Sequence, residues 1–166
     1  MRVGIPKEIK NHEYRVGLSP ASVREIVKHG HEVVVETGAG LGIGAADRQY
    51  RTAGARVADS AEEIFATAGM IVKVKEPQPA ERAMLSEGQL LYTYLHLAPD
   101  PEQTRDLVES GATCVAYETV TSPLGGLPLL APMSKVAGRM SIQAGAYCLE
   151  QPHGGLGMLL GGVPGV

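Results

Sequence analysis

Short apolar runs alternate with amphipathic stretches along most of the chain. The runs are continuous in apolar residues rather than strictly alternating, which is typical of strands covered on both faces. Runs of this kind, separated by helical patterns, indicate a parallel sheet. We therefore expect a three-layer α/β domain of the flavodoxin-like type, with a mostly parallel sheet and helices on both faces. The predicted strands are Arg2–Ile5, His31–Glu36, Ala55–Val57, Met70–Val74, Leu90–Tyr94 and Thr113–Ala116.

Helix signals fall between these runs. Ser19 and Pro20 supply an N-cap and a proline at the first helical position, and Gly30 fits the end of the same helix. Ser60 is a second candidate N-cap, with Glu63 at the position that completes a capping box. The further helices predicted in this part of the chain are Ala46–Ala53, Ser60–Ala66, Ala80–Leu85 and Pro101–Ser110.

The pattern changes after Val120. Thr121–Pro128 is rich in glycine and proline and predicts a loop, and Met133–Glu150 predicts a longer helix. Gly154–Val166 holds too many glycines for a helix and resembles a linker. We expect a substrate-binding α/β domain over 1–129, then an interdomain helix and glycine-rich lead-in over 130–166. The apolar stripe of the long helix comprises Ala137, Met140, Ala144, Tyr147 and Cys148.

Composition excludes several classes of function. The 166 residues carry a net charge of -3, which gives no electrostatic case for binding nucleic acid or an anionic membrane. The N-terminus lacks the apolar core of a signal peptide, and no stretch is long enough to span a bilayer. Cys114 and Cys148 lack metal-ligand spacing, and His29 and His31 lie too close to a helix end for a metal site. We expect reduced core thiols, no metal and a cytoplasmic protein.

Polar side chains follow several predicted strands at the point where each strand ends. In open parallel sheets, ligands bind in the crevice outside these carboxyl ends. Arg15 and Lys75 are cations suited to a carboxylate, and His96 titrates near neutral pH. The set predicts a site for a small anionic substrate that exchanges a proton. The residues at these strand ends are Lys7, Glu8, Arg15, Lys75, Glu76, His96, Tyr117 and Glu118.

Each candidate has an alternative explanation. Taken singly, Arg15 and Lys75 are better explained as solvated loop charges. His96, between Leu95 and Leu97, fits a packed core histidine. The functional interpretation depends on convergence of several groups at one edge of the sheet.

Three further residues are open to two interpretations. Tyr94 at a strand end fits packing or a pocket wall. Glu118 fits an ion pair with Lys75 or a helix cap. Met133 fits packing at the start of the long helix, or a flexible thioether that lines a substrate pocket.

A glycine pattern follows the second predicted strand. Gly40–Ala45 matches G-x-G-x-x-A, and Asp59 lies at roughly the distance expected of a ribose-binding acid. The helix that follows has few apolar positions to pack on a sheet. A glycine-rich turn therefore explains the pattern better than a phosphate-binding loop.

The chain resembles the N-terminal region of the alanine dehydrogenases, over its whole length and in the same order. The segments that carry the resemblance are Met1–Glu8, Glu13–Val16, Lys73–Pro77, Leu95–Ala98, Ala116–Val120, Ala131–Ser134 and Gly161–Val166. The related nicotinamide nucleotide transhydrogenases share the opening strand, the arginine and the Gly-Ala-Gly turn. Their pattern lacks the Leu-His-Leu-Ala and Tyr-Glu-Thr-Val segments, which favours the amino-acid dehydrogenases.

The resemblance implies reversible oxidation of L-alanine by NAD to pyruvate and ammonia. By this resemblance Arg15 and Lys75 hold the carboxylate and keto oxygen, and His96 is the acid/base. Tyr94 and Met133 line the pocket, whereas Glu118 supports Lys75 and Ser134 touches the cofactor.

In the family a nucleotide-binding domain follows, and the enzymes form hexamers. The resemblance therefore implies that most of the NAD site lies outside this chain, which alone is expected to be inactive, as a fragment or a split gene product. The alternatives are a transhydrogenase alpha-type domain, or a non-catalytic remnant that binds a small 2-oxo acid.

Overall fold

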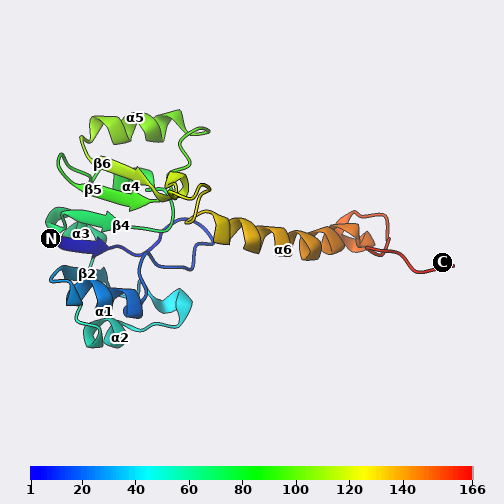
Figure 1. Ribbon diagram of the computed structural model, residues 1–166, viewed down its shortest axis with the longest axis horizontal. Coiled ribbons are helices and arrows are strands. Elements are labelled where there is room, and N and C mark those ends of the chain that lie inside the picture. The colour runs from blue at the N-terminus through cyan, green and yellow to red at the C-terminus, as the bar shows by residue number, and fades with distance from the viewer. Residues whose placement is uncertain (166) are drawn as a thin grey trace. The chain divides into compact units, whose positions relative to one another are not determined.

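The computed structural model describes residues 1–165, and the chain divides into two compact units, Met1–Tyr117 and a second that begins at Glu118. Figure 1 shows the first unit as a sheet with helices packed against it. The predicted division lies later, between residues 129 and 130. The compact α/β unit ends one residue after its last strand.

The sheet of the first unit has six strands, all parallel, in the order β3-β2-β1-β4-β5-β6. This confirms the predicted parallel α/β architecture. The order reverses between β1 and β4, as in doubly wound sheets. If the edge strand β3 is set aside, the remaining order β2-β1-β4-β5-β6 is the 2-1-3-4-5 order of flavodoxin-like sheets. The strands are β1 (Arg2–Ile5), β2 (Glu32–Glu36), β3 (Arg56–Ala58), β4 (Met70–Val72), β5 (Leu90–Thr93) and β6 (Thr113–Ala116).

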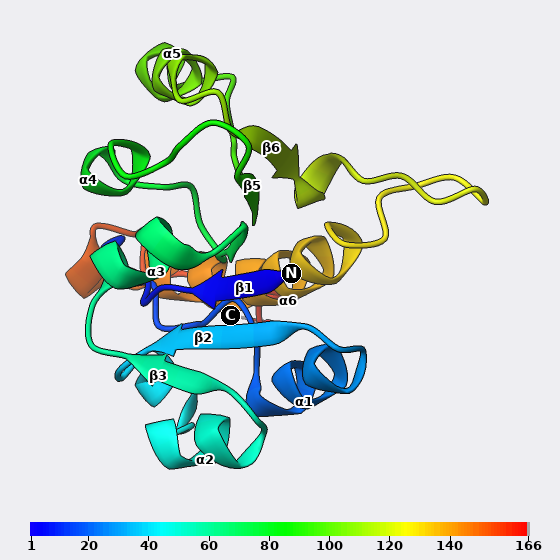
Figure 2. The same cartoon turned by 90° about the vertical axis from the view of Figure 1, so that its left-hand side faces the viewer.

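Helices cover both faces of this sheet, as α1 and α3 illustrate on opposite sides of the strands in Figure 2. Val33 and Val35 of β2 belong to one apolar cluster with residues of α1 and α2, whereas Val34 belongs to another with α3 and α5. Successive side chains of β2 therefore pack into two different apolar clusters, because they point to opposite faces of the sheet. The helices are α1 (Pro20–Lys28), α2 (Asp47–Thr52), α3 (Ala61–Thr67), α4 (Pro79–Arg82) and α5 (Pro101–Glu109).

Two helix starts test the predicted caps. The Ser19 hydroxyl accepts from the Ser22 amide at 3.3 Å, and Pro20 begins α1 as predicted. The Ser60 hydroxyl likewise accepts from the Glu63 amide at 3.4 Å. The Glu63 carboxylate, however, pairs with Arg56 and accepts from the Asp59 amide. The predicted capping box is therefore not formed, because a charged partner on β3 takes the carboxylate.

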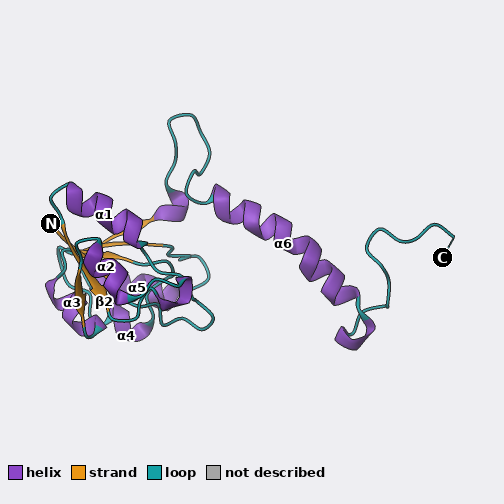
Figure 3. Ribbon diagram, turned by 90° about the horizontal axis from the view of Figure 1, so that it is seen from below, coloured by secondary structure: helices purple, strands orange, loops and turns teal. Residues whose placement is uncertain are grey.

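The boundary between the units falls within the short helix η2 (Tyr117–Thr119), after its first residue. The second unit contains α6 (Ala131–Leu149) and η3 (Gln151–His153). Figure 3 shows α6 as one continuous helix. No residue of α6 is buried. Cys148 is exposed, so its prediction as a core thiol is wrong, because nothing within this unit covers the apolar stripe. Cys114 on β6 is half-buried, and burial raises the pKa of its thiol.

Within residues 1–165, no helix is both long and apolar enough to cross a bilayer. 

Candidate functional site

Arg15 lies in the segment that follows β1, and its guanidinium is paired with the carboxylate of Glu13. The Arg15 guanidinium donates from Nε to Glu13 Oε1 at 2.8 Å and from NH2 to Oε2 at 2.6 Å. The Arg15 amide also donates to Glu13 Oε1, at 2.9 Å. This guanidinium lowers the pKa of Glu13, as does the charge of Lys75. The Arg15 side chain is 54% exposed, so its guanidinium is accessible to a second carboxylate.

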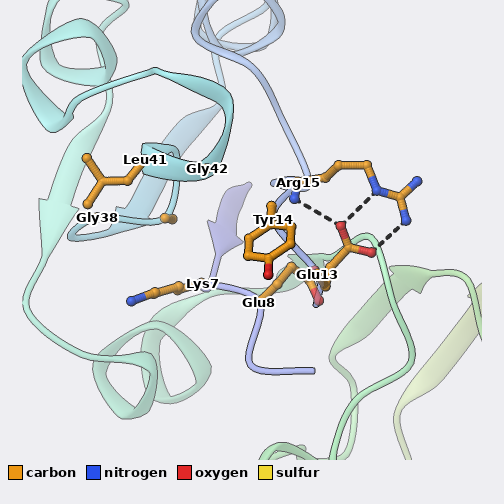
Figure 4. Close-up of a pocket in the computed structure, with 9 residues that line it drawn as sticks. Lys7, Glu8, Glu13, Tyr14, Arg15, Gly38, Leu41 and Gly42 are labelled. Atoms are coloured by element: carbon orange, nitrogen blue, oxygen red, sulfur yellow. Dashed lines mark hydrogen bonds and ion pairs between the residues drawn. The ribbon is translucent and has the colours of Figure 1, made fainter. Parts of the chain in front are cut away.

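Arg15 lines a small cavity at the carboxyl ends of β1 and β2. Its volume is about 110 Å³, which suits a molecule of a few heavy atoms. Figure 4 shows the Glu13 carboxylate turned towards the Arg15 guanidinium. The Tyr14 ring lies between this pair and the loop that carries Leu41 and Gly42. The lining residues are Lys7, Glu8, Glu13, Tyr14, Arg15, Gly38, Ala39, Leu41 and Gly42.

Lys75, Tyr94 and His96 come together at the exits of β4 and β5. Lys75 Nζ lies over the Tyr94 ring, 4.9 Å from its centroid, which is a cation–π contact. The edge of the Tyr94 ring meets the His96 ring at 5.8 Å between centroids. Arg15 follows β1, Lys75 follows β4 and His96 follows β5, so the parallel sheet places both predicted cations and the histidine at its carboxyl edge.

His96 lies directly after buried Leu95 and is itself exposed. The alternative of a packed core histidine is therefore wrong. Its φ of 48° places it in the left-handed region, which non-glycine residues adopt rarely and histidine more often than most. In this conformation the exposed imidazole lies next to the Tyr94 ring. Such backbone outliers are concentrated at functional sites.

The remaining predicted residues belong to the second unit. Glu118 lies in η2, Met133 is half-buried in the first turn of α6, and Ser134 next to it is exposed. Their roles stay predictions.

Sequence reasoning missed a buried ion cluster beside the site. Lys73 is 2% exposed, and its Nζ lies 3.2 Å from Glu8 Oε2 and 2.6 Å from Glu81 Oε1. Burial raises the pKa of Glu8, while the Lys73 charge opposes that rise. The available signal was a lysine inside the apolar run Met70–Val74, since a buried lysine requires a paired charge.

The glycine pattern after β2 does not fit a dinucleotide. A Cβ on Gly42 would overlap the Tyr14 carbonyl oxygen, so this glycine permits close approach of two backbone segments. Asp47 at the start of α2 accepts from Thr37 Oγ1 at 2.7 Å and from the Gly38 amide at 2.8 Å. The Asp47 carboxylate occupies these two donors, and its negative charge would repel a pyrophosphate. The loop supports the segment that carries Arg15, and the turn interpretation holds.

Across the described residues, His, Cys, Asp and Glu form no group of three that could hold a metal ion.

The chain is similar to known proteins over its whole length. The family model "Alanine dehydrogenase/PNT, N-terminal domain" matches residues 4–137. The chain is 57% identical to an alanine dehydrogenase of Halomonas elongata over 166 residues, covering all of this chain and 45% of that protein. It is 51% identical to an alanine dehydrogenase of Bacillus subtilis, of which it covers 43%. The chain thus spans less than half the length of these curated relatives.

Solved structures show the same similarity. One titled L-alanine dehydrogenase superposes with a TM-score of 0.88 at 57% identity, over all of this chain and 46% of that one. A transhydrogenase from Sinorhizobium meliloti superposes with a TM-score of 0.68 at 35% identity, over 71% of this chain and 35% of that one.

Proposed function

The chain belongs to the alanine dehydrogenase/PNT family, and we propose that it is the substrate-binding part of an NAD-dependent alanine dehydrogenase. That enzyme converts L-alanine, NAD and water to pyruvate, ammonia and NADH. The observation that carries the proposal is the placement of Arg15, Lys75 and His96 at the carboxyl edge of the sheet. Arg15 is paired there with Glu13, and the Tyr94 ring contacts both Lys75 and His96.

The two cations have different roles in this proposal. The planar Arg15 fork binds the substrate carboxylate, in exchange for or beside Glu13. Lys75 donates to the keto oxygen and stabilises the negative charge that develops there. The Tyr94 face holds the Lys75 ammonium, because a desolvated ring attracts a cation.

His96 is the proposed acid/base. An imidazole next to the reacting carbon donates a proton to a developing alkoxide and accepts one from a carbinolamine hydroxyl. Its exposure at the sheet edge gives it access to a substrate. Glu118 is proposed to support Lys75, and Met133 and Tyr94 to line the pocket.

NAD supplies the hydride acceptor in this reaction. We assign most of its site to residues outside 1–165, since the glycine pattern after β2 does not fit it. Ser134 is the proposed contact from this chain. We also propose a cytoplasmic enzyme that assembles as a homo-oligomer.

Pyruvate binding tests the site directly. We expect the lysine ε-methylene and histidine ring signals of Lys75 and His96 to shift on titration of the 166-residue chain with pyruvate. Lys75→Met should weaken binding at least about tenfold, because a charge-assisted hydrogen bond is lost. Lys28→Met, an exposed lysine paired with Glu25, is the control and should bind normally. Absence of shifts at saturating pyruvate would contradict the site.

Activity tests the reaction. The chain joined to the nucleotide-binding part of the Halomonas elongata relative should reduce NAD in the presence of L-alanine. The same fusion carrying Lys75→Met should not. If the fusion folds and binds pyruvate yet reduces no NAD, the non-catalytic 2-oxo-acid-binding alternative gains support.

The transhydrogenase alternative rests on the similarity to the Sinorhizobium meliloti structure. The alanine dehydrogenase structure covers more of the chain at higher identity, which favours the dehydrogenase. A fusion that exchanges hydride between nicotinamide nucleotides without alanine would favour the alternative.

A further inference from the structure

Lys75 lies beyond the hydrogen-bonded part of its strand. The regular ladder of β4 ends at Val72, and the Lys73 amide still donates to the Tyr92 carbonyl at 3.1 Å. Val74 is nonetheless buried and Lys75 is half-buried. Backbone polar groups in such a position need partners other than a strand, because an unpaired buried group is costly.

Three side chains supply these partners. Glu8 Oε1 accepts from the Val74 amide at 2.6 Å. The Tyr117 hydroxyl donates to the Val74 carbonyl at 2.7 Å, and Thr93 Oγ1 donates to the Lys75 carbonyl at 2.8 Å. Glu8 follows β1, Thr93 ends β5 and Tyr117 follows β6. The backbone of Val74 and Lys75 is therefore held by side chains at the ends of three other strands of the sheet.

The ammonium end of the Lys75 side chain is also in contact with an aromatic ring of this edge of the sheet. Its Nζ lies over the Tyr94 ring, whose edge meets Tyr117 at 6.0 Å between centroids. Tyr117 thus contacts both the backbone next to Lys75 and the ring beneath its ammonium. A lysine has a long, flexible side chain, so an ammonium placed by chance would sample many positions.

We propose that Glu8, Thr93 and Tyr117 are positioning residues that hold the Lys75 ammonium where it meets the keto oxygen of the substrate. This inference rests on the proposed function, because it deepens the role given to Lys75. Displacement of a substrate-binding group by about 1 Å costs up to about a hundredfold in rate. The hydrogen bonds to Val74 and Lys75 prevent that displacement.

Thr93 offers the sharpest test. It is fully buried, and Thr93→Val keeps its shape while it removes the hydroxyl. Thr93→Ser restores the hydroxyl. Glu8 is less suitable, since its loss also removes a partner of the buried Lys73. Tyr117→Phe is the second variant, because it removes only the hydroxyl that donates to Val74.

The first measurement needs no ligand. Because Lys75 Nζ lies over the Tyr94 ring, we expect the adjacent ε-methylene proton resonance to be shifted upfield in the 166-residue chain. We expect Thr93→Val and Tyr117→Phe to reduce this shift and Thr93→Ser to restore it. An undiminished shift in both variants overturns the positioning role.

The second measurement is pyruvate affinity, in the normal and the Lys75→Met background. Thr93→Val should weaken binding roughly three- to tenfold, as loss of one neutral hydrogen bond does, and Thr93→Ser should recover it. In the Lys75→Met background Thr93→Val should change nothing further, since a residue that acts through Lys75 has no effect without it. A purely structural residue would weaken binding equally in both backgrounds, and that result overturns the proposal.

Failure of the proposed function has a different signature. If the unaltered chain does not bind pyruvate, the site assignment fails. The upfield shift of Lys75 and its response to Thr93→Val then decide the positioning role alone.

Discussion

At the scale of single residues, the site depends on Glu13 as much as on its cations. This carboxylate binds the Arg15 fork with both oxygens and also experiences the charge of Lys75. Both cations are proposed to bind the same substrate. A substrate carboxylate that arrives at Arg15 finds a guanidinium already oriented by an anion of the same kind.

The pH dependence of stability tests this pair. The Arg15 guanidinium lowers the pKa of Glu13 from its ordinary value of 4.5. The stabilisation is therefore complete above that value and is lost as pH falls through the lower folded-state pKa. Glu13→Gln should lower the free energy of unfolding near neutral pH and flatten its decline in acid, as measured by urea midpoints. Glu87→Gln, at an exposed carboxylate, is the control. A decline in Glu13→Gln as steep as in the unaltered chain would contradict the role of the pair.

His96 permits a separation of chemistry from backbone geometry. Asparagine tolerates the left-handed region, so His96→Asn should keep the fold at its φ of 48°. In the fusion with a nucleotide-binding part, it should lower kcat on alanine roughly a hundredfold or more, the usual contribution of an acid/base. His12→Asn is the matched control, because His12 has a φ of 60°. Equal activity of the two variants would remove His96 from the mechanism.

At the scale of elements, the loop between β2 and α2 is a support for the segment that carries Arg15. Gly42 lies against the Tyr14 carbonyl, one residue before Arg15. The function of the glycine pattern is therefore close packing of two backbones at the edge of the sheet.

Gly42→Ala should displace the Tyr14 segment. We expect a loss of roughly 2 kcal/mol of stability from overpacking, with weaker pyruvate binding because Arg15 moves. Gly44→Ala is the control in the same loop: its φ is 74° and its Cβ would meet open space. It should cost roughly 1 kcal/mol through strain and leave pyruvate affinity unchanged. Equal pyruvate affinity of both variants would show that the loop does not support the site. Calorimetry and titration measure the two effects.

At the scale of the whole molecule, the two compact units differ in how they are stabilised. Both apolar clusters of buried residues lie in the first unit. The long helix α6 buries none of its residues and contains Gly138 and Gly145. An isolated helix of this kind is marginal in water, since most helical stability in proteins comes from packing.

Amide hydrogen exchange should therefore separate the units. We expect slow exchange in β1, β2 and β5, and exchange in α6 that is faster by orders of magnitude. Measurement over a range of protein concentrations provides the control. Protection of α6 equal to that of the sheet in dilute solution would show that α6 is stabilised by its own sequence. Protection that rises with concentration would show that other copies of the chain cover its apolar stripe.

Much of the fold was predictable because its signals are local. Continuous apolar runs such as Met70–Val74 identified every strand of the sheet, and Ser19 with Pro20 identified the start of α1. The place of β3 at the edge of the sheet was not predictable in this way, since the order of strands depends on which pairs form hydrogen bonds rather than on any one segment. The burial of Cys148 was wrong for a related reason: an apolar stripe shows that a helix can be covered, and not that it is.

The sequence by itself determined that Arg15, Lys75 and His96 follow strand ends, and parallel geometry then implies that they share one edge. Only the tertiary structure decided what holds them there. Glu8 reaches Val74 across 66 positions of sequence, and Tyr117 reaches the same residue from β6. Such contacts depend on strand order and register, which arise from pairing over the whole sheet. The local sequence pattern thus predicts which residues form the site, and long-range hydrogen bonds fix their positions.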